Sequence, residues 1–285
     1  MNDSPIGLIG VGLLGTALTE RMLAARLPVV GYDCRPERCE HLRSLGGEFA
    51  KRAADVVTGC DAIVLCLPDS QTVASVIGEV GEVLRPGKLI VDSTTGDPAQ
   101  TEALASGLAA RGVGYIDATI AGSSEQVRRG EAVAIIGGSS EHVKLAMSIL
   151  AAWTGRRFHV GPAGSGARLK LVVNLVLGLN RAVLAEGLSL AKACGIDQAS
   201  ALEVLKETPA YSSVMDTKGQ KMIDREFSPQ ARLAQHLKDV RLIRELAARY
   251  GATAPLSELH EAILQMAVDL GHGEADNSAV IAAFG

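Results

Sequence analysis

The chain has 285 residues, of which 32 are acidic and 28 are basic, so its formal net charge is -4. This length allows one large domain or two ordinary ones. The balanced charge excludes the polycationic surface typical of proteins that bind nucleic acid or anionic membranes, so we expect neither as a partner.

The positions of cysteine and histidine indicate neither disulfides nor a metal site. The five cysteines form no C-x-x-C pair and fit no usual zinc spacing, which is typical of reduced thiols and favours a cytoplasmic location. Asp3 stands where a signal peptide carries positive charge, so we expect no leader. We expect the histidines to lie at the surface or to cap helices rather than to bind metal: His41, His142, His159, His236, His260 and His272.

Up to about residue 160, short β-branched runs alternate with longer helical patterns, as in βαβ units with a parallel sheet. The predicted strands are Ile6–Ile9, Val29–Tyr32, Ala62–Leu67, Leu89–Asp92, Gly114–Ala118 and Ala132–Ile136. We therefore expect an α/β fold that begins with a doubly wound parallel sheet.

After Gly164 the sequence indicates only helices, which predicts a domain boundary near residue 162, with domains at 1–162 and 163–285. The first helix of the second domain, about residues 166–193, is unusually long and mostly apolar. Its polar residues make it a poor membrane span, because a span needs about 20 apolar residues. We expect it to pack on several sides, including against a second subunit.

Three glycines form a G-x-G-x-x-G motif between the first strand and a helical run. This spacing suits a tight turn, close approach of the backbone to a pyrophosphate, and phosphates at a helix N-terminus. The alternative is a turn needed only for chain reversal. We interpret the segment as a dinucleotide site formed by Gly10, Val11, Gly12, Leu13, Leu14 and Gly15.

Asp33 lies at the end of the second predicted strand, 18 positions after Gly15. Its carboxylate can accept hydrogen bonds from a ribose diol, and its charge repels a 2'-phosphate. Arg35 could instead hold that phosphate, or be a solvated arginine at a helix entry. The sequence therefore favours NAD over NADP.

Two hydroxyl-bearing loops, CLPDSQTV and VDSTTGDP, follow neighbouring strands and should meet at the carboxyl edge of the sheet, where ligands bind in doubly wound folds. We expect their hydroxyls to face the cofactor. The alternative is that they only cap helices, as these residue types commonly do. This alternative applies to Asp69, Ser70, Thr94, Thr95 and Asp97.

A small-residue turn at Ala121, Gly122 and Ser123 follows the strand ending in DATIA. Its backbone N–H groups, at a predicted helix start, could hold a carboxylate without any arginine. The alternative is a glycine turn needed for chain reversal. Arg128 and Arg129 are expected on a solvated helix face, with a substrate role left open.

Lys170 and Asn174 lie one turn apart on the long apolar helix, just after the glycine-rich turn GPAGSG. Burial beside the positive end of a helix disfavours the lysine cation, which suits an acid or base. The alternative is a lysine at the edge of a buried helix whose ammonium reaches solvent.

Six segments in this order make the chain resemble the β-hydroxyacid dehydrogenase family, which is related to 6-phosphogluconate dehydrogenase. They are GLIGVGLLG, LPDSQTV, DSTTGDP, DATIAGSSEQVRRGE, GPAGSGARLKLVVN and HLKDVRL. The resemblance implies a Rossmann-type domain, an all-α domain joined to it by a long helix, and a homodimer or homotetramer.

The resemblance also implies roles for individual residues. Lys170 matches the catalytic lysine, and Asn174 matches the asparagine that holds substrate beside it. Gly122 and Ser123 fall in the turn that binds the substrate carboxylate, to which we add Thr94 and Ala121 as substrate-site candidates. Positions near the cofactor are matched by Leu67, Pro68, Thr72, Thr95 and Lys238.

The implied reaction is hydride transfer between a nicotinamide cofactor and a small 3-hydroxy acid or its semialdehyde, like that of 3-hydroxyisobutyrate dehydrogenase. Ala121, Val173 and Ala231 depart from the family's usual residues where substrate is gripped, which leaves the substrate open. The alternatives are an imine reductase, whose relatives generally lack the lysine, and a dinucleotide-binding regulatory module without turnover.

Overall fold

The structure is a computed structural model that describes residues 4–285. Contacts divide the chain into two units, one ending at Lys170 and one beginning at Leu171, and each is described by itself. The dividing point lies inside the long helix α9 (Ser165–Ala193). The predicted boundary after residue 162 falls in the turn before this helix and stays a prediction.

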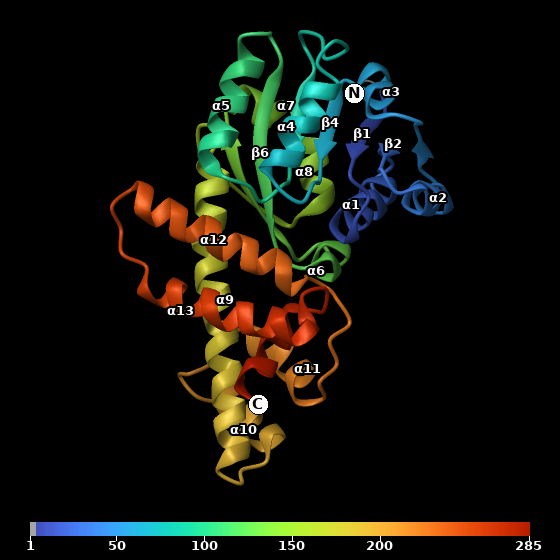
Figure 1. The fold of residues 1–285 in the computed structure, drawn as a ribbon. Coiled ribbons are helices and arrows are strands. Elements are labelled where there is room, and N and C mark those ends of the chain that lie inside the picture. Colours follow the sequence, from blue (N-terminus) through green and yellow to red (C-terminus); the bar gives the residue numbers. More distant parts are fainter. Residues whose placement is uncertain (1–3) are drawn as a thin grey trace. The chain divides into compact units, whose positions relative to one another are not determined.

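Within the described residues, the first unit forms an eight-stranded sheet with the order β3-β2-β1-β4-β5-β6-β7-β8 (Figure 1). All neighbouring strands are parallel except β6 and β7, which pair antiparallel. The strands are β1 (Ile6–Ile9), β2 (Val29–Tyr32), β3 (Glu48–Phe49), β4 (Ala62–Leu65), β5 (Leu89–Asp92), β6 (Gly114–Ala121), β7 (Val133–Gly138) and β8 (Arg156–Gly161).

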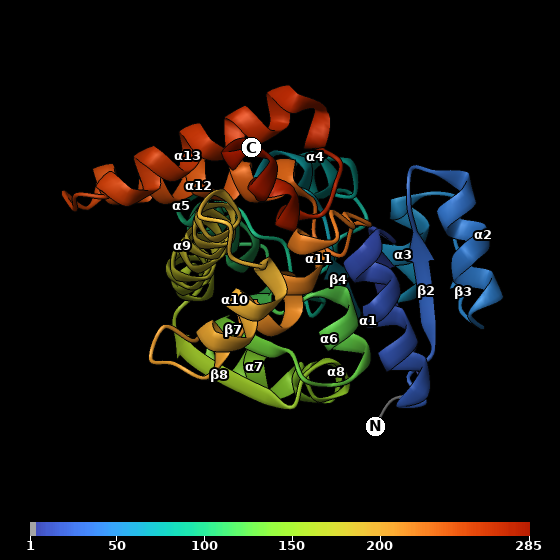
Figure 2. The ribbon, with the colours of Figure 1, turned by 90° about the horizontal axis from the view of Figure 1, so that it is seen from below.

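Helices pack on both faces of this sheet, because its central strands are buried apolar runs that need cover on each side. One core includes side chains of α1 (Leu13–Ala24), α2 (Pro36–Ser44), α6 (Ser124–Arg128), α7 (Ser140–Leu145) and α8 (Met147–Trp153). The other includes side chains of α3 (Ala53–Gly59), α4 (Ser70–Glu79) and α5 (Pro98–Ala109). Figure 2 shows α2 beside the edge of the sheet that β2 and β3 form. The doubly wound sheet is therefore confirmed.

Three predicted strands, β1, β2 and β5, have the predicted bounds, and three others differ at their ends. The prediction of a parallel sheet is confirmed for every neighbouring pair except β6 and β7, which pair antiparallel because only 11 residues separate them and parallel pairing needs a longer crossover. It also missed β3, which has two residues, and β8, an edge strand whose side chains are mostly exposed. Neither carries the apolar run that reveals a buried strand.

The second unit is helical, and beyond α9 its described residues form only helices, turns and one isolated bridge. Helices α12 and α13 lie side by side (Figure 1). This confirms the predicted all-α second part. After α9 the elements are α10 (Gln198–Lys206), η1 (Met215–Gly219), α11 (Gln220–Ile223), α12 (Leu233–Arg249), α13 (Pro255–Ala267), η2 (Val268–His272) and η3 (Asn277–Phe284).

Helix α9 is long and apolar enough to cross a membrane by length and composition alone. Core helices of soluble proteins pass the same test, so this is weak evidence. In the part of α9 that follows Leu171, four apolar side chains are exposed. They are spaced by four, seven and seven residues, which places them along one stripe of the helix. We call this set the α9 stripe: Val172, Val176, Val183 and Leu190.

A buried ion pair supports the C-terminal segment of the second unit. The Asp276 carboxylate is fully buried, and Lys218 Nζ donates to its Oδ1 at 2.8 Å. Backbone N–H groups of Gln230, Ala231 and Ser278 also donate to Asp276. Although burial raises the pKa of this carboxyl, Lys218 and the N–H donors lower it to about 2, so Asp276 stays ionised.

Two histidines are buried in the second unit, which corrects the expectation that all six lie at the surface or cap helices. His236 and His260 are buried, with ring centroids 5.2 Å apart. A Cβ at Gly178 would lie 2.3 Å from His236 Nε2, so the glycine makes room for these rings. Burial, and then the charge of Arg181, lowers the pKa of His260 to about 4.

Arg181 is the least compensated charge near His260. Its side chain is 4% exposed, and within residues 4–285 its Nε and Nη1 have no hydrogen-bond acceptor. Burial lowers the pKa of this guanidinium to about 10, and the charge of Asp276 opposes the shift. Because that value is still well above neutral pH, a cation with two unsatisfied donors is buried, which destabilises the fold.

We expect Arg181→Met to raise the pKa of His260 above about 4, because the neighbouring positive charge is removed while burial remains. The free energy of unfolding should stay unchanged or rise by up to about 4 kcal/mol, since an apolar chain replaces a poorly satisfied ion. NMR titration of His260 and urea denaturation at pH 7 measure the two effects, with His260→Gln identifying the signal.

His260 has a lowered folded pKa, so its contribution to stability is present above the ordinary histidine value and is lost as the pH falls towards 4. Arg181→Met should therefore reduce the stability that His260 loses at acid pH, because its folded pKa moves closer to the ordinary histidine value. A His260 pKa that stays at about 4 in the variant would show that burial alone sets it.

Candidate active site

In the turn after β1, packing within the protein requires glycine at two positions. Gly10 has φ +99°, and a Cβ there would lie 2.2 Å from the carbonyl oxygen of Cys66. A Cβ at Gly15 would lie 2.1 Å from the carbonyl oxygen of Gly10. Side chains at either position would therefore push the turn away from the neighbouring strand.

Gly12 differs, because a Cβ there would meet only Arg38 Nη1, at 3.8 Å. Packing within the chain does not explain a glycine at this position, whereas close approach of a ligand to the backbone does. Gly12 is also the N-cap of α1, so no side chain caps the helix, and the first turn has no acidic residue. The backbone N–H groups at the N-terminus of α1, the positive end of the helix, suit the binding of a pyrophosphate.

Asp33 lies directly after β2 and is almost fully buried. Its Oδ2 accepts from Val11 N at 2.8 Å and from Arg38 Nη1 at 3.0 Å, and its Oδ1 accepts from Arg35 N at 3.0 Å. Burial raises the pKa of Asp33, but the bonds from Arg35, Arg38 and Val11 outweigh it and lower the pKa overall. The carboxylate is therefore ionised at neutral pH and holds the glycine turn.

Arg38 is a residue that the sequence analysis missed. Its guanidinium forms an ion pair with Asp33 and lies near Gly12, so it adds positive charge where an adenosine ribose would bind in a fold of this kind. The sequence offered one signal for this role: Arg38 lies in the first turn of α2, five residues after Asp33.

The loops after β4 and β5 meet at one edge of the sheet, as predicted. Leu67 N donates to Thr94 Oγ1 at 3.2 Å, which joins the two loops. Thr72 donates from both N and Oγ1 to Asp69 Oδ1, at 2.8 and 2.7 Å. Asp69 and Asp97 are the N-caps of α4 and α5, so the capping interpretation holds for both. Pro68 and Thr95 lie in the same two loops.

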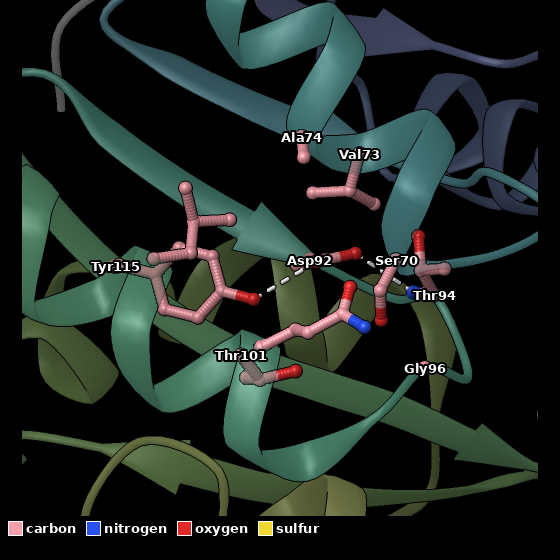
Figure 3. A pocket seen from close by; sticks show the side chains of 10 residues that line it. Ser70, Val73, Ala74, Asp92, Thr94, Gly96, Thr101 and Tyr115 are labelled. Carbon is pink, nitrogen blue, oxygen red and sulfur yellow. Dashed lines mark hydrogen bonds between the residues drawn. The ribbon is translucent and has the colours of Figure 1, made fainter. Parts of the chain in front are cut away.

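Beneath these loops, Asp92 accepts from Tyr115 Oη at 2.9 Å and from Thr94 N at 2.9 Å (Figure 3). Burial raises the pKa of Asp92, although hydrogen bonds from Thr94 and Tyr115 oppose the shift. The adjoining cavity of about 30 Å³ has room for about one water molecule, so it is not a substrate pocket. The pair instead fixes the course of the loop that carries Thr94 and Thr95.

The predicted carboxylate turn follows β6 and is partly engaged by its own helix. Gly122 has φ +150°, a conformation that favours glycine. Ser123 is the N-cap of α6: its Oγ accepts from Gln126 N at 3.2 Å, and its N–H donates to Gln126 Oε1 at 2.8 Å. A carboxylate bound here would therefore compete with the Gln126 amide for the Ser123 N–H.

Arg128 and Arg129 are both held by ion pairs. Arg128 Nε lies 2.6 Å from Glu20 Oε2, and Arg129 Nε lies 2.9 Å from Glu131 Oε2. The interactions with Glu20 and Glu125 raise the pKa of Arg128. These contacts favour the structural interpretation of the two arginines over a substrate role.

Lys170 lies in the second turn of α9 and is 7% exposed, which argues against an ammonium that reaches solvent. Asn174 follows one turn later on the same helix and is also buried. In the second unit, Asn174 Nδ2 donates to Asp239 Oδ2 at 2.8 Å, and Lys238 Nζ lies 2.9 Å from Asp239 Oδ1. One carboxylate therefore orients both predicted site residues of this unit.

Asp239 was not predicted as a site residue, although it follows Lys238 in the motif HLKDVRL. Its role depends on a contact with Asn174, 65 residues away, which local spacing does not reveal. No group of three or more His, Cys, Asp or Glu side chains within residues 4–285 is placed to hold a metal ion.

Two family models together match nearly the whole chain. The NAD binding domain of 6-phosphogluconate dehydrogenase matches residues 5–161, and the NAD-binding domain of NADP-dependent 3-hydroxyisobutyrate dehydrogenase matches residues 164–284. Fold and turn chemistry thus define an NAD(P)-binding oxidoreductase. The chain belongs to the β-hydroxyacid dehydrogenase family, whose members act on hydroxy acids.

Among curated relatives, L-threonate dehydrogenase of Cupriavidus necator is 29% identical over 98% of this chain and 95% of its own length. Cytokine-like nuclear factor N-PAC of Xenopus tropicalis is 28% identical over 99% of this chain. The chain spans about half of that relative, 53% of its length.

Among solved structures, 3-hydroxyisobutyrate dehydrogenase from Salmonella typhimurium superposes with a TM-score of 0.90 at 25% identity, covering 97% of this chain and 98% of that one. Psf3, solved with NADP+ and 2-OPP, has a TM-score of 0.90 at 24% identity over 98% of this chain and 100% of its own. An imine reductase from Pseudomonas sp. has a TM-score of 0.69 at 21% identity, over 100% of both chains. The last two show the fold alone.

Proposed function

We propose that the protein transfers a hydride between a nicotinamide cofactor and a small 3-hydroxy acid or its semialdehyde, with Lys170 as the general acid and base. The observation that carries the proposal is a lysine buried in the second turn of α9, one turn before Asn174. Burial disfavours the charged form of a lysine, which suits a group that must take up and release a proton. The curated relative that acts on L-threonate, an acid bearing hydroxyl groups, supports this substrate class.

The bound nicotinamide would supply the hydride chemistry. In oxidation, neutral Lys170 would take the proton from the substrate hydroxyl, and in reduction its ammonium would return a proton to the forming alkoxide. Asn174 would orient the substrate oxygen, and Asp239 would keep the Asn174 amide in place. The backbone around Gly122 would bind the substrate carboxylate, with Ala121 and Thr94 beside it.

For the cofactor, we propose NAD over NADP. The ionised, almost buried Asp33 supports this, since it would accept from a ribose diol and repel a 2'-phosphate. Arg38 favours NADP instead, because its ion pair with Asp33 neutralises part of the carboxylate charge. Leu67, Pro68, Thr72 and Thr95 would line the nicotinamide half, and we propose Lys238 as a further cofactor-binding residue.

We also propose a homodimer or homotetramer in the cytoplasm. The α9 stripe supports self-association, because it is a set of apolar side chains on one helix that no other part of the described chain covers. The five cysteines are all free thiols, which suits a reducing compartment.

We expect Lys170→Ala to lower kcat by about 10²- to 10⁴-fold while leaving the Kd for NAD+ unchanged, because the variant removes only the proton transfer. A spectrophotometric panel of hydroxy acids that includes L-threonate and 3-hydroxyisobutyrate identifies the substrate and measures the loss. Lys192→Ala, on the same helix, is the matched control. Full turnover in Lys170→Ala would disprove the acid and base assignment, and turnover only with imines would favour the imine reductase alternative.

We expect the protein to bind NAD+ more tightly than NADP+, and Arg38→Ala to weaken NADP+ binding by about 10- to 100-fold more than NAD+ binding. The reason is that an arginine–phosphate hydrogen bond contributes about 1.5–3 kcal/mol. Calorimetry with both cofactors measures this, and Arg43→Ala on the same helix is the control. Tighter binding of NADP+ by the unaltered protein would show that the arginines dominate Asp33.

We expect the protein to sediment as a dimer or larger, and Val183→Glu to shift it towards the monomer mass of 29.7 kDa. The side chain of Val183 is 69% exposed, so the substitution adds charge to the α9 stripe without disturbing the core. Val204→Glu is the control, because Val204 is also a valine and is 63% exposed, but lies on α10. An unaltered protein that is monomeric at micromolar concentration would contradict the proposal.

A further inference from the structure

A buried carboxylate on β6 holds the start of α9. Asp117 lies in the middle of β6 and is 2% exposed. Its Oδ1 accepts from Gly164 N at 2.8 Å, and its Oδ2 accepts from Ala167 N at 2.7 Å. These are N–H groups of the turn before α9 and of its first turn, which no intrahelical carbonyl can satisfy. The contacts all lie within the first unit.

Two glycines leave just enough room for this carboxylate. Gly137 pairs with Asp117 across the antiparallel strands, and a Cβ there would lie 2.5 Å from Asp117 Oδ1. A Cβ at Gly166, in the first turn of α9, would lie 2.6 Å from Asp117 Oδ2 and 2.8 Å from the carbonyl oxygen of Ile135. The helix start is therefore pressed directly against β6 and β7, and any side chain at these positions would separate them.

Lys170 follows Ala167 by three residues, so the two lie on adjacent turns and on neighbouring sides of α9. Fixing the N–H of Ala167 to β6 fixes the height and rotation of α9 at Lys170. The same strand ends at Ala121, where the Gly122 turn begins. One strand thus sets both the turn proposed for the substrate carboxylate and the start of the lysine's helix.

We propose that Asp117 is a positioning residue for Lys170: its ionised carboxylate clamps the first turn of α9 to β6 and holds the lysine in register with the Gly122 turn. This inference rests on the proposed role of Lys170 as the acid and base. Neither the signal that identifies the glycine turn nor the resemblance to the family assigns a task to Asp117.

The clamp depends on ionisation. Burial raises the pKa of Asp117 to about 6, although the N–H groups of Gly164 and Ala167 oppose the shift. Below that pH one oxygen carries a proton and is a poorer acceptor, so the first turn of α9 is held less firmly. Because the folded pKa is raised, protonation favours the folded state as the pH falls through 6. Lower pH should therefore weaken positioning without weakening the fold through this group.

Other groups around Asp117 also carry charge. The charge of Asp92 on β5 raises the pKa of Asp117. The charge of Asp117 in turn raises the pKa of Tyr115 on β6. On α9, Arg168 pairs with Glu102 of α5, and Lys170 follows on the next turn. On β8, His159 is an ionisable side chain whose Nε2 lies 2.8 Å from the Gly138 carbonyl oxygen. His159→Gln is therefore needed to exclude that residue.

The test measures kcat for reduction of the semialdehyde from pH 5 to 8, because in this direction Lys170 must be protonated and an acid limb cannot come from its loss of base function. We expect kcat of the unaltered protein and of His159→Gln to fall below about pH 6. In Asp117→Asn the limb should vanish and kcat at pH 7.5 should be about 10- to 100-fold lower, with KM for the cofactor unchanged. An acid limb that persists in Asp117→Asn would overturn the proposal.

Hydrogen exchange measured by mass spectrometry gives a readout that needs no substrate. Amides in the first two turns of α9 should exchange at least about tenfold faster in Asp117→Asn, because one N–H then faces an amide donor instead of an acceptor. Asp197→Asn is the matched control, since Asp197 caps α10 through Ser200 N at 2.9 Å, far along the chain from Lys170. Unchanged exchange in Asp117→Asn would overturn the clamp whatever the activity.

Two further outcomes separate this inference from the proposed function. Faster exchange with unchanged kcat would overturn the positioning role and leave the proposed function intact. If Lys170→Ala keeps full turnover, the acid and base assignment fails, and the positioning of Lys170 has no catalytic meaning. If Asp117→Asn does not fold, the pH profile of the unaltered protein beside that of His159→Gln decides, because a flat profile in both would overturn the proposal.

Discussion

The contact between the Asp117 carboxylate and the first turn of α9 joins the strand that precedes the Gly122 turn to the helix that carries Lys170. A helix start has N–H groups without partners, and a buried carboxylate needs donors, so each offsets the cost of burying the other. The contact is possible only because glycine stands at positions 137 and 166. Through this contact the antiparallel strands β6 and β7 hold the first turn of a 29-residue helix.

Carboxylates recur as the organising groups of this molecule, each in a different electrostatic setting. Asp33 has donors enough to remain ionised, and it ties the glycine turn to the second strand. Asp92 is buried with fewer donors, and it shapes the loop that carries Thr94. Asp239 orients Asn174 and Lys238 in the second unit. For Asp33 and Asp92, the hydrogen-bond donors oppose the effect of burial on the pKa, and only at Asp33 do they outweigh it.

The sequence predicted what depends on neighbours along the chain and missed what depends on distant partners. β1, β2 and β5 have their predicted bounds because each is a buried apolar run between turn residues. The edge strand β8 was missed because its mostly exposed side chains carry no apolar pattern. Asp117 was missed because its donors lie 47 and 50 residues away, and Arg38 because its guanidinium acts through Asp33 across the start of α2. The two buried histidines were missed because the glycine that makes room for them lies on another helix.

The turn at Gly122 shows why reaction and substrate are encoded differently. The proton transfer that we propose needs one lysine on a fixed helix, and here the Asp117 carboxylate holds the start of that helix through two backbone N–H groups. Gripping a particular acid needs free donors of a particular number and direction, and here the Ser123 N–H already donates to Gln126. An acid that binds at this turn must gain more from the N–H than the Gln126 amide does, which a charged carboxylate can achieve because charged acceptors form stronger hydrogen bonds. If substrate binds at this turn as we propose, the capping box would favour anionic substrates over neutral ones.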